Sequence, residues 1–114
     1  MKVLVCGGRD YADDLRVFDV LDELWRDRAV EAIIHGGASG ADSLARRWAN
    51  YRDVPHVPYP AEWMRYGPAA GPLRNQRMLD QSKPDLVVAF PGGTGTADMV
   101  RRARSANVEV LEIE

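Results

Sequence analysis

Five short apolar runs punctuate the chain and predict five β-strands. They span Val3–Cys6, Ala32–His35, Val54–Tyr59, Leu86–Phe90 and Val108–Ile113. The Leu86–Phe90 run is uninterrupted rather than alternating, which is typical of a strand covered on both faces. The pattern therefore favours a sheet buried between two layers.

Helical spacing of apolar residues fills the intervals between these runs. One stripe consists of Ala41, Leu44, Ala45, Trp48 and Ala49, which follow the i, i+3, i+4, i+7, i+8 pattern. A second stripe uses Val17, Val20, Leu21, Leu24 and Trp25, and a weaker one uses Ala97, Val100 and Ala103 before Asn107, a plausible left-handed cap. A further helix is predicted from Pro72 to about Gln81. Trp25 and Trp48 fall on the stripes, so both are expected in the core.

Strands alternating with helices indicate one α/β domain over residues 1–114, with an open parallel five-stranded sheet and helices on both faces. Right-handed crossovers favour the strand order 3-2-1-4-5. In that order a ligand crevice opens between the first and fourth strands, at their carboxyl ends. The Pro- and Gly-rich segment Pro55–Pro72 is interpreted as a long functional loop.

Composition narrows the class of protein. The 114 residues include 15 Lys and Arg against 17 Asp and Glu, a net charge of −2, and 46% are hydrophobic. Overall disorder is excluded, and a strongly basic nucleic-acid-binding module is disfavoured. A lone Cys6 and the lack of a long apolar segment or signal-peptide core predict a soluble, cytoplasmic protein without a membrane partner.

Glycine pairs follow three of the five strands: Gly7-Gly8-Arg9, Gly36-Gly37-Ala38-Ser39-Gly40 and Pro91-Gly92-Gly93-Thr94-Gly95-Thr96. Such loops let backbone N–H groups approach an anion at a helix N-terminus. The three strands should be neighbours at the crevice, so the loops predict a phosphate site. None of the three loops is a Walker A motif, and G-x-G-x-x-G does not follow the first strand, which disfavours ATP hydrolysis and ordinary NAD binding.

Several side chains admit both a ligand-binding and a structural interpretation. Thr94 and Thr96 could bind phosphate or cap a helix, whereas Ser39 and Asp42 match a capping box, which is the favoured interpretation. Arg9, Arg74 and Arg77 could bind a second phosphate or stack on a base, with a solvated surface as the alternative for Arg77. Arg101, Arg102 and Arg104 are expected to form a solvated basic face.

An aromatic candidate lies in the Pro-bounded loop. Trp63 could stack on a base or pack the loop against the sheet. His35 and His56 lack further ligands at metal-binding spacing, so neither a metal nor a cofactor is expected.

The motifs together resemble the SLOG superfamily of Rossmann-like proteins, which unites Lonely Guy phosphoribohydrolases with the DNA-processing protein DprA. The resemblance rests on Gly36–Asp42, Arg74–Met78 and Pro91–Thr96. Ala61-Glu62-Trp63 and Gly71-Pro72-Leu73-Arg74-Asn75 are similar to segments of the small, stand-alone YspA-like branch. The resemblance implies a nucleotide-derived ligand with its phosphate on the Gly92–Thr96 loop, and it supports a role for Asn75.

Catalysis is less clearly implied. Lonely Guy enzymes end this motif with a glutamate that works with an upstream arginine; Arg74 matches the arginine, but Met99 stands at the glutamate position. A thioether cannot stabilise an oxocarbenium-like centre or activate water. Asp98, Asp10 and Glu62 remain candidate carboxylates.

Three functions are therefore weighed, in order of preference. The first is a binding module that senses or sequesters a nucleotide-derived molecule. The second is a nucleoside 5′-monophosphate phosphoribohydrolase, and the third is DNA binding of the DprA type. Lonely Guy proteins pair through helices beside the nucleotide site, so the resemblance also implies a homodimer.

Overall fold

The computed structural model describes all of residues 1–114 and contains one five-stranded sheet. Its strands are β1 (Lys2–Cys6), β2 (Ala32–His35), β3 (His56–Pro58), β4 (Leu86–Ala89) and β5 (Glu109–Glu112). Every pairing is parallel, and the order across the sheet is β3-β2-β1-β4-β5. The predicted α/β class, parallel sheet and strand order are confirmed.

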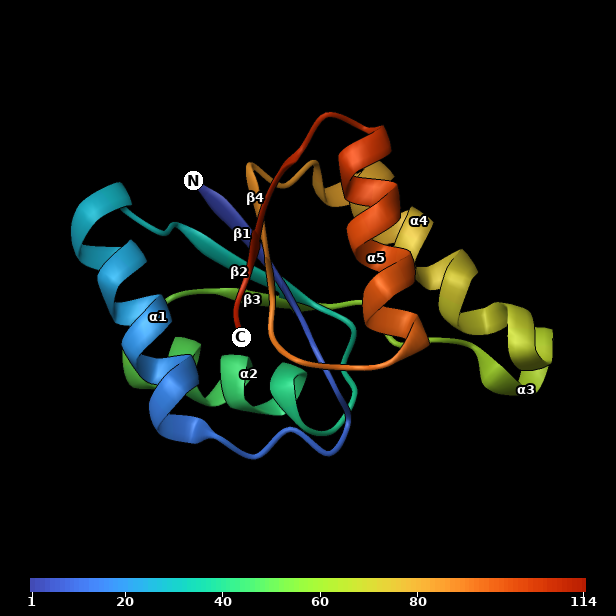
Figure 1. The fold of residues 1–114 in the computed structure, drawn as a ribbon, viewed down its shortest axis with the longest axis horizontal. Coiled ribbons are helices and arrows are strands. Elements are labelled where there is room, and N and C mark those ends of the chain that lie inside the picture. The colour runs from blue at the N-terminus through green and yellow to red at the C-terminus, as the bar shows by residue number, and fades with distance from the viewer.

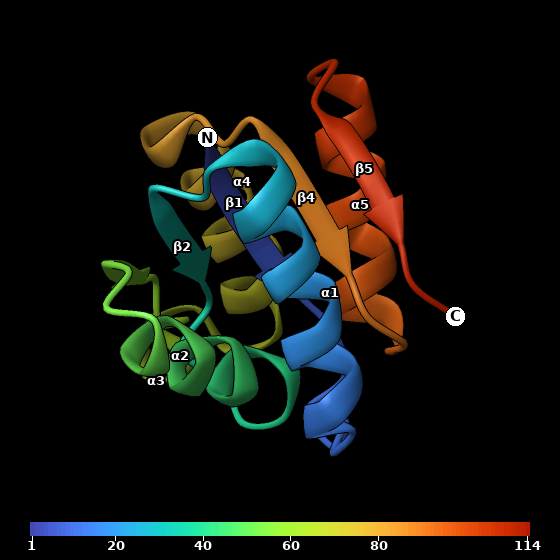
Figure 2. The same ribbon diagram turned by 90° about the vertical axis from the view of Figure 1, so that its left-hand side faces the viewer.

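Helices cover both faces of the sheet (Figure 1, Figure 2). They are α1 (Asp14–Arg28), α2 (Ala41–Tyr51), α3 (Trp63–Tyr66), α4 (Ala70–Ser82) and α5 (Thr94–Ser105), with one 3-10 turn, η1, at Gly67–Ala69. None of these helices is long and apolar enough to cross a membrane.

Alternate side chains of the central strand β1 enter two separate apolar cores. Val3 and Val5 pack with α1 and α2, whereas Leu4 and Cys6 pack with α4 and α5. Because a parallel strand between two helical layers buries both faces, its sequence is continuously apolar. Polar groups that could contact a ligand are therefore found in the loops at the ends of this strand rather than on its faces.

The segment predicted as a long loop differs from the expectation. The third strand is restricted to His56–Pro58 at the sheet edge, and α3 and η1 follow it. Helix α4 begins at Ala70, two residues before Pro72. Proline is compatible with this position because N–H groups in the first turn of a helix need no intrahelical acceptor. Asn107 adopts the predicted left-handed conformation, with φ 59°.

The two tryptophans on the helical stripes have different environments. Trp48 is fully buried, as predicted, and its indole N–H donates to Asp22 at 2.8 Å. The prediction for Trp25 is wrong, because this residue is 38% exposed. It lies at the border of the α1 stripe, where the Arg52 guanidinium stacks over its ring.

Candidate functional site

A cavity of about 740 Å³ lies at the carboxyl ends of β1 and β4, where the strand order reverses. Segments after β1, β2 and β4 form one side, and α3 and α4 contribute the other. The predicted binding residues that line it are Gly7, Gly8, Arg9, Gly36, Trp63, Arg74, Asn75, Gly93, Thr94, Gly95 and Thr96. Gly37, Ser39 and Gly92 lie outside the lining.

The three glycine loops are hydrogen-bonded to one another. The Gly8 N–H donates to the Pro91 carbonyl at 2.9 Å, and the Gly8 carbonyl accepts from the Ala41 N–H at 3.1 Å. Ser39 Oγ donates to the Arg9 carbonyl at 3.1 Å. Gly40 has φ 74°, and a Cβ there would collide with the Gly8 carbonyl, so only glycine fits. These contacts make the loops one unit, which we call the loop platform (residues 7–10, 36–41 and 91–93).

The N-terminus of α5 presents unpaired backbone donors to the cavity. The N–H groups of Gly93, Thr94, Gly95 and Thr96 have no hydrogen-bond acceptor within the protein. A Cβ on Gly93 or Gly95 would meet no atom within 4 Å, so the approach to these donors is open. Neither Thr94 nor Thr96 caps α5, whose N-cap is Gly93. Orphaned donors and the helix dipole together suit an anion.

Asp42 is a cavity residue that the sequence analysis missed. The predicted capping box is wrong, because α2 has Gly40 as its N-cap and no side chain caps it. Instead, Asp42 Oδ2 accepts from the N–H groups of Gly36 at 3.0 Å and Ala38 at 3.2 Å. Burial raises the pKa of Asp42 to about 6, although the Ala38 N–H and the Arg74 charge oppose this. The available signal was its place in the sequence: this aspartate directly follows a glycine loop at the carboxyl end of a strand.

Arg74 ties α4 to the β2 loop. Its Nη1 donates to the carbonyls of Gly36 at 2.8 Å and Tyr59 at 3.3 Å, and its Nε donates to Asn75 Oδ1 at 3.1 Å. Burial lowers the pKa of Arg74, although the nearby Asp42 carboxylate favours the charged form. Because Asp42 holds the Gly36 N–H and Arg74 holds its carbonyl, this backbone segment is fixed from both sides.

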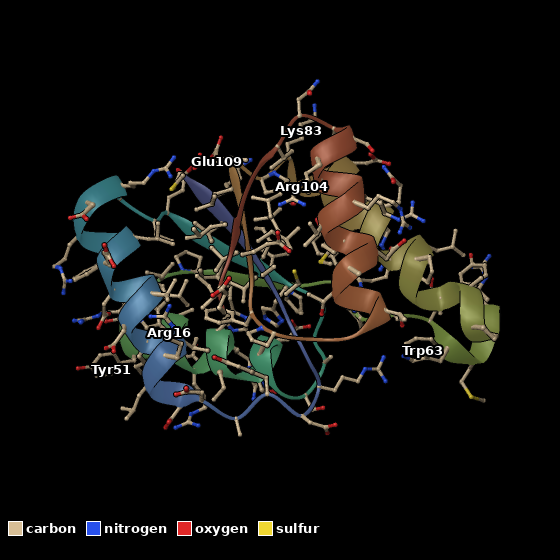
Figure 3. The ribbon with its side chains drawn as sticks, viewed as in Figure 1. Arg16, Tyr51, Trp63, Lys83, Arg104 and Glu109 are labelled. Carbon is tan, nitrogen blue, oxygen red and sulfur yellow. The ribbon has the colours of Figure 1, made fainter.

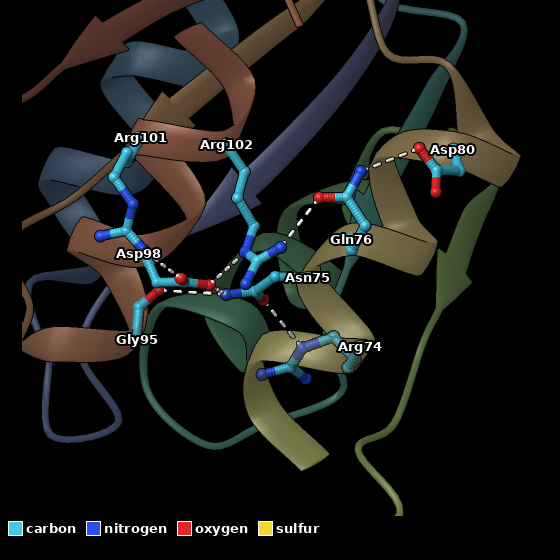
Figure 4. A network of polar contacts seen from close by, with 8 residues as sticks. All are labelled: Arg74, Asn75, Gln76, Asp80, Gly95, Asp98, Arg101 and Arg102. Atoms are coloured by element: carbon cyan, nitrogen blue, oxygen red, sulfur yellow. Dashed lines mark hydrogen bonds and ion pairs between the residues drawn. The ribbon is translucent and has the colours of Figure 1, made fainter. Parts of the chain in front are cut away.

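Asp98 lines the cavity, but both of its carboxylate oxygens already accept hydrogen bonds from side chains of α4 and α5 (Figure 4). It accepts from Asn75 Nδ2 at 3.0 Å, from Arg102 Nε at 2.9 Å and from Arg101. Burial opposes ionisation of Asp98, yet the hydrogen bonds from Asn75 and Arg102 hold its pKa below the usual value. The expected solvated arginine face is confirmed for Arg101 and Arg104, which are exposed although they form ion pairs. It is wrong for Arg102, whose side chain is 30% exposed and pairs with Asp98.

The other carboxylate candidates are separated from the cavity. Glu62 lies 3.6 Å from Arg77 in an ion pair, and neither residue belongs to the lining, nor does the exposed Asp10. Met99 has no exposed surface and packs in the core against α4 and the sheet. A glutamate at position 99 would therefore be buried in that core rather than face the cavity.

Trp63 stands at the margin of the cavity and is directed from α3 toward the body of the molecule (Figure 3). The Arg9 guanidinium lies 5.0 Å from its ring centroid. A Cβ on Gly71 would lie 3.3 Å from Trp63 Cη2, so the indole packs closely on α4. A base that stacked on this part of the ring would compete with Arg9.

The structure brings His35 and His56 into contact. His35 Nε2 and His56 Nδ1 are 3.1 Å apart, and the Gly37 N–H donates to His35 Nδ1. Burial, followed by the His56 charge, lowers the pKa of His35 to about 4. Parallel pairing of β2 with β3 places the rings side by side, and no group of three metal-ligating residues surrounds them.

Comparison with known proteins identifies the family. The chain is similar to the Gene 61 protein of Mycobacterium phage D29, with 37% identity in an alignment 119 positions long; the match covers 96% of this chain and 94% of that protein. It resembles in fold the crystal structure of the C-terminal domain of a hydrogenase from Pyrococcus furiosus, with a TM-score of 0.52, 18% identity, and coverage of 98% and 90% of the two chains. Residues 1–66 match the YspA, cpYpsA-related SLOG family. The chain therefore belongs to the YspA-like branch of the SLOG superfamily.

Proposed function

We propose that this protein binds a nucleotide or nucleotide-derived ligand in the cavity and acts as a sensor or sequestering module. The observation that carries the proposal is the row of unpaired N–H groups from Gly93 to Thr96, which opens into a cavity of ligand size. Arg9 and Arg74 line the same cavity and supply positive charge. Membership of the SLOG superfamily supports a nucleotide-related ligand.

The lining suggests how such a ligand would lie. Its phosphate would rest on the first turn of α5, where the helix dipole and the free N–H groups act together. Its base would extend toward Trp63, the aromatic side chain of the lining. Arg9 lies over the Trp63 ring, so its guanidinium is available to the same ligand.

Binding without base release is favoured because the positions where a catalytic carboxylate is expected do not offer a free one. Met99 is buried in the core, and Asp98 already accepts hydrogen bonds on both oxygens. The alternative, a nucleoside 5′-monophosphate phosphoribohydrolase, would have to use Asp42, the cavity carboxylate with an oxygen that the protein leaves free.

A nucleotide panel tests both functions. Calorimetry with AMP, GMP, CMP, UMP and the matching nucleosides should detect binding that requires the 5′-phosphate, and chromatography should detect no free base over hours. Arg104→Ala is a suitable control variant, because Arg104 pairs with Glu112 outside the cavity. Absence of phosphate-dependent binding would contradict the proposal, whereas base release would establish the enzyme.

A further inference from the structure

Two carboxylates, Asp42 and Asp98, line the cavity, and they differ in whether each carboxylate oxygen already accepts a hydrogen bond from the protein. Both oxygens of Asp98 accept hydrogen bonds from side chains of α4 and α5. Asp42 uses only Oδ2, which takes the N–H groups of Gly36 and Ala38. Its Oδ1 accepts no hydrogen bond from the protein, although Asp42 is only 7% exposed. Asp42 is therefore fixed in orientation with one acceptor oxygen unused.

The surroundings of Asp42 determine which ligand group could satisfy that oxygen. Arg74 from α4 and Arg9 after β1 are the charged groups that face it, and the nearby Cys6 of β1 is neutral because burial raises its thiol pKa to about 12. With a pKa near 6, Asp42 is ionised at neutral pH. An anionic phosphate oxygen is thus repelled from Oδ1, whereas a hydroxyl can donate to it. Oδ1 is not enclosed, since the buried side-chain N or O atom without a partner is Arg77 Nε, so a ligand hydroxyl can approach it and form a charge-assisted hydrogen bond.

The position of Asp42 in the fold matches the sugar of a nucleotide. Asp42 reaches back over the carboxyl end of β2 through its bonds to Gly36 and Ala38, on the opposite side of β1 from the α5 N-terminus. In doubly wound sheets that bind dinucleotides, an acidic side chain near the end of the second strand holds a ribose hydroxyl while the phosphate lies at the helix N-terminus after the first strand. Here the free N–H groups belong to α5, which follows β4, the other neighbour of β1, so a ligand that spans the end of β1 would bring its sugar to Asp42.

We infer that Asp42 recognises the sugar of the bound ligand, with its free Oδ1 accepting hydrogen bonds from a ribose hydroxyl. This inference rests on the proposed nucleotide-binding function and adds to it the selection of ribonucleotides over deoxyribonucleotides. It also places the sugar on the β2 side of the cavity, with Oδ1 taking a hydroxyl rather than a phosphate oxygen.

The test compares AMP with 2′-deoxy-AMP and 3′-deoxy-AMP by calorimetry at pH 7.5. The wild-type protein should bind at least one deoxy compound about 10-fold to 100-fold more weakly than AMP, which is the range for a hydrogen bond to a charged group. Asp42→Asn should reduce this preference to less than threefold. Its amide oxygen can still accept from Gly36 and Ala38, while its NH₂ group replaces Oδ1. Asp80→Asn is the matched control, because Asp80 lies on the exposed side of α4 and bonds only Gln76.

Each result has a defined meaning. Equal affinity of the wild type for AMP and both deoxy compounds overturns the inference and leaves nucleotide binding intact. A preference that survives Asp42→Asn also overturns it. Failure of the wild type to bind any phosphorylated compound would instead reject the proposed function. The wild-type comparison needs no substitution, so it decides the inference even if Asp42→Asn does not fold.

Discussion

Asp42 carries an energetic cost that its neighbours only partly offset. Burial raises its pKa from the usual 3.8 to about 6, so the folded protein binds this proton more tightly than the unfolded chain does. The stabilising effect of protonation is fully present below pH 4 and is lost as the pH rises through 6. At neutral pH the ionised carboxylate therefore lowers the free energy of unfolding.

Asp42→Asn should consequently make the protein more stable at pH 7.5. We expect a gain of about 1–2 kcal/mol, less than the ~3 kcal/mol for the whole pKa difference, because an amide oxygen is the weaker acceptor. Urea denaturation of the variant and the wild type from pH 4 to pH 8 measures it. The gain should shrink as the pH falls below 6, and a variant that is less stable at every pH would contradict the prediction.

Alanine variants of Arg74 and Arg9 should distinguish a residue that both binds the ligand and stabilises the fold from one that only binds the ligand. Arg74→Ala removes a charge from the cavity and the bonds to Gly36 and Tyr59, so we expect a loss of about 1.5–3 kcal/mol in binding a phosphorylated ligand and also a lower melting temperature. Arg9→Ala should weaken the same ligand and change the melting temperature less than Arg74→Ala does, because the Arg9 guanidinium stacks on the Trp63 ring and makes no hydrogen bond or ion pair within the protein. Equal losses for the nucleoside and its monophosphate would show that these arginines do not contact phosphate.

At the scale of elements, two neighbouring glycines of the β4–α5 loop have different roles: Gly92 allows the loop to pack, and Gly93 leaves the N–H groups of α5 open to a ligand. A Cβ on Gly92 would collide with Thr96 Oγ1 and lie 2.7 Å from the Gly8 nitrogen, so Gly92 is required for the loop to pack. Gly93 meets nothing within 4 Å and faces the open approach to the N–H groups.

Gly93→Val should therefore abolish phosphate-dependent binding while the fold is retained. The branched side chain would occupy the space above the α5 donors without striking the protein. Gly92→Ala, the matched variant, should lower stability by at least ~1 kcal/mol because the neighbouring backbone must shift. Circular dichroism, thermal denaturation and calorimetry on both proteins check the pair; unchanged affinity in Gly93→Val would refute the phosphate site.

The sequence predicted elements well where burial is continuous. Strand runs such as Leu86–Phe90 are covered on both faces, so their apolar pattern revealed the parallel sheet and, with right-handed crossovers, its order. Short edge elements gave no such signal: α3 and η1 bury no side chain, and the pattern of residues 55–72 suggested only a loop.

Local interpretation failed where distant residues compete for the same groups. Ser39 and Asp42 match a capping box, but the Gly8 carbonyl takes the Ala41 N–H, and the two side chains turn to the Arg9 carbonyl and the Gly36 loop. The contact of Arg74 with Gly36 spans 38 residues, and no local pattern encodes it. The glycine loops indicated the place of the candidate site, whereas its internal hydrogen bonds required the structure.

At the scale of the whole molecule, exposed apolar residues lie beside the cavity. Tyr66 and Leu73 are 39% and 49% exposed and share a shallow depression between α3 and α4, and the neighbouring Met64 is fully exposed. We propose that two copies of the chain pair through this surface, because the resemblance to Lonely Guy proteins implies pairing through helices beside the ligand site. A stable dimer needs about 800 Å² buried on each partner.

Leu73→Glu should then convert a dimer into a monomer, because it places a charge in the apolar contact. Light scattering at tens of micromolar measures the mass. Leu15→Glu is the control, since Leu15 is 74% exposed on α1, which covers the other face of the sheet. A monomeric wild type, or a dimer that tolerates Leu73→Glu, would count against this surface.

The loop platform has a consequence for selectivity. Its segments are linked by the two hydrogen bonds of Gly8 and by the tight approach of Gly40, so the wall that would face phosphate and sugar is preorganised. The opposite wall, built by Trp63 and the short α3, has no buried side chain in that helix and can adjust at little cost. We therefore expect strict discrimination among phosphate and sugar variants but tolerance toward different bases, so that one protein could respond to a whole set of cellular ribonucleotides.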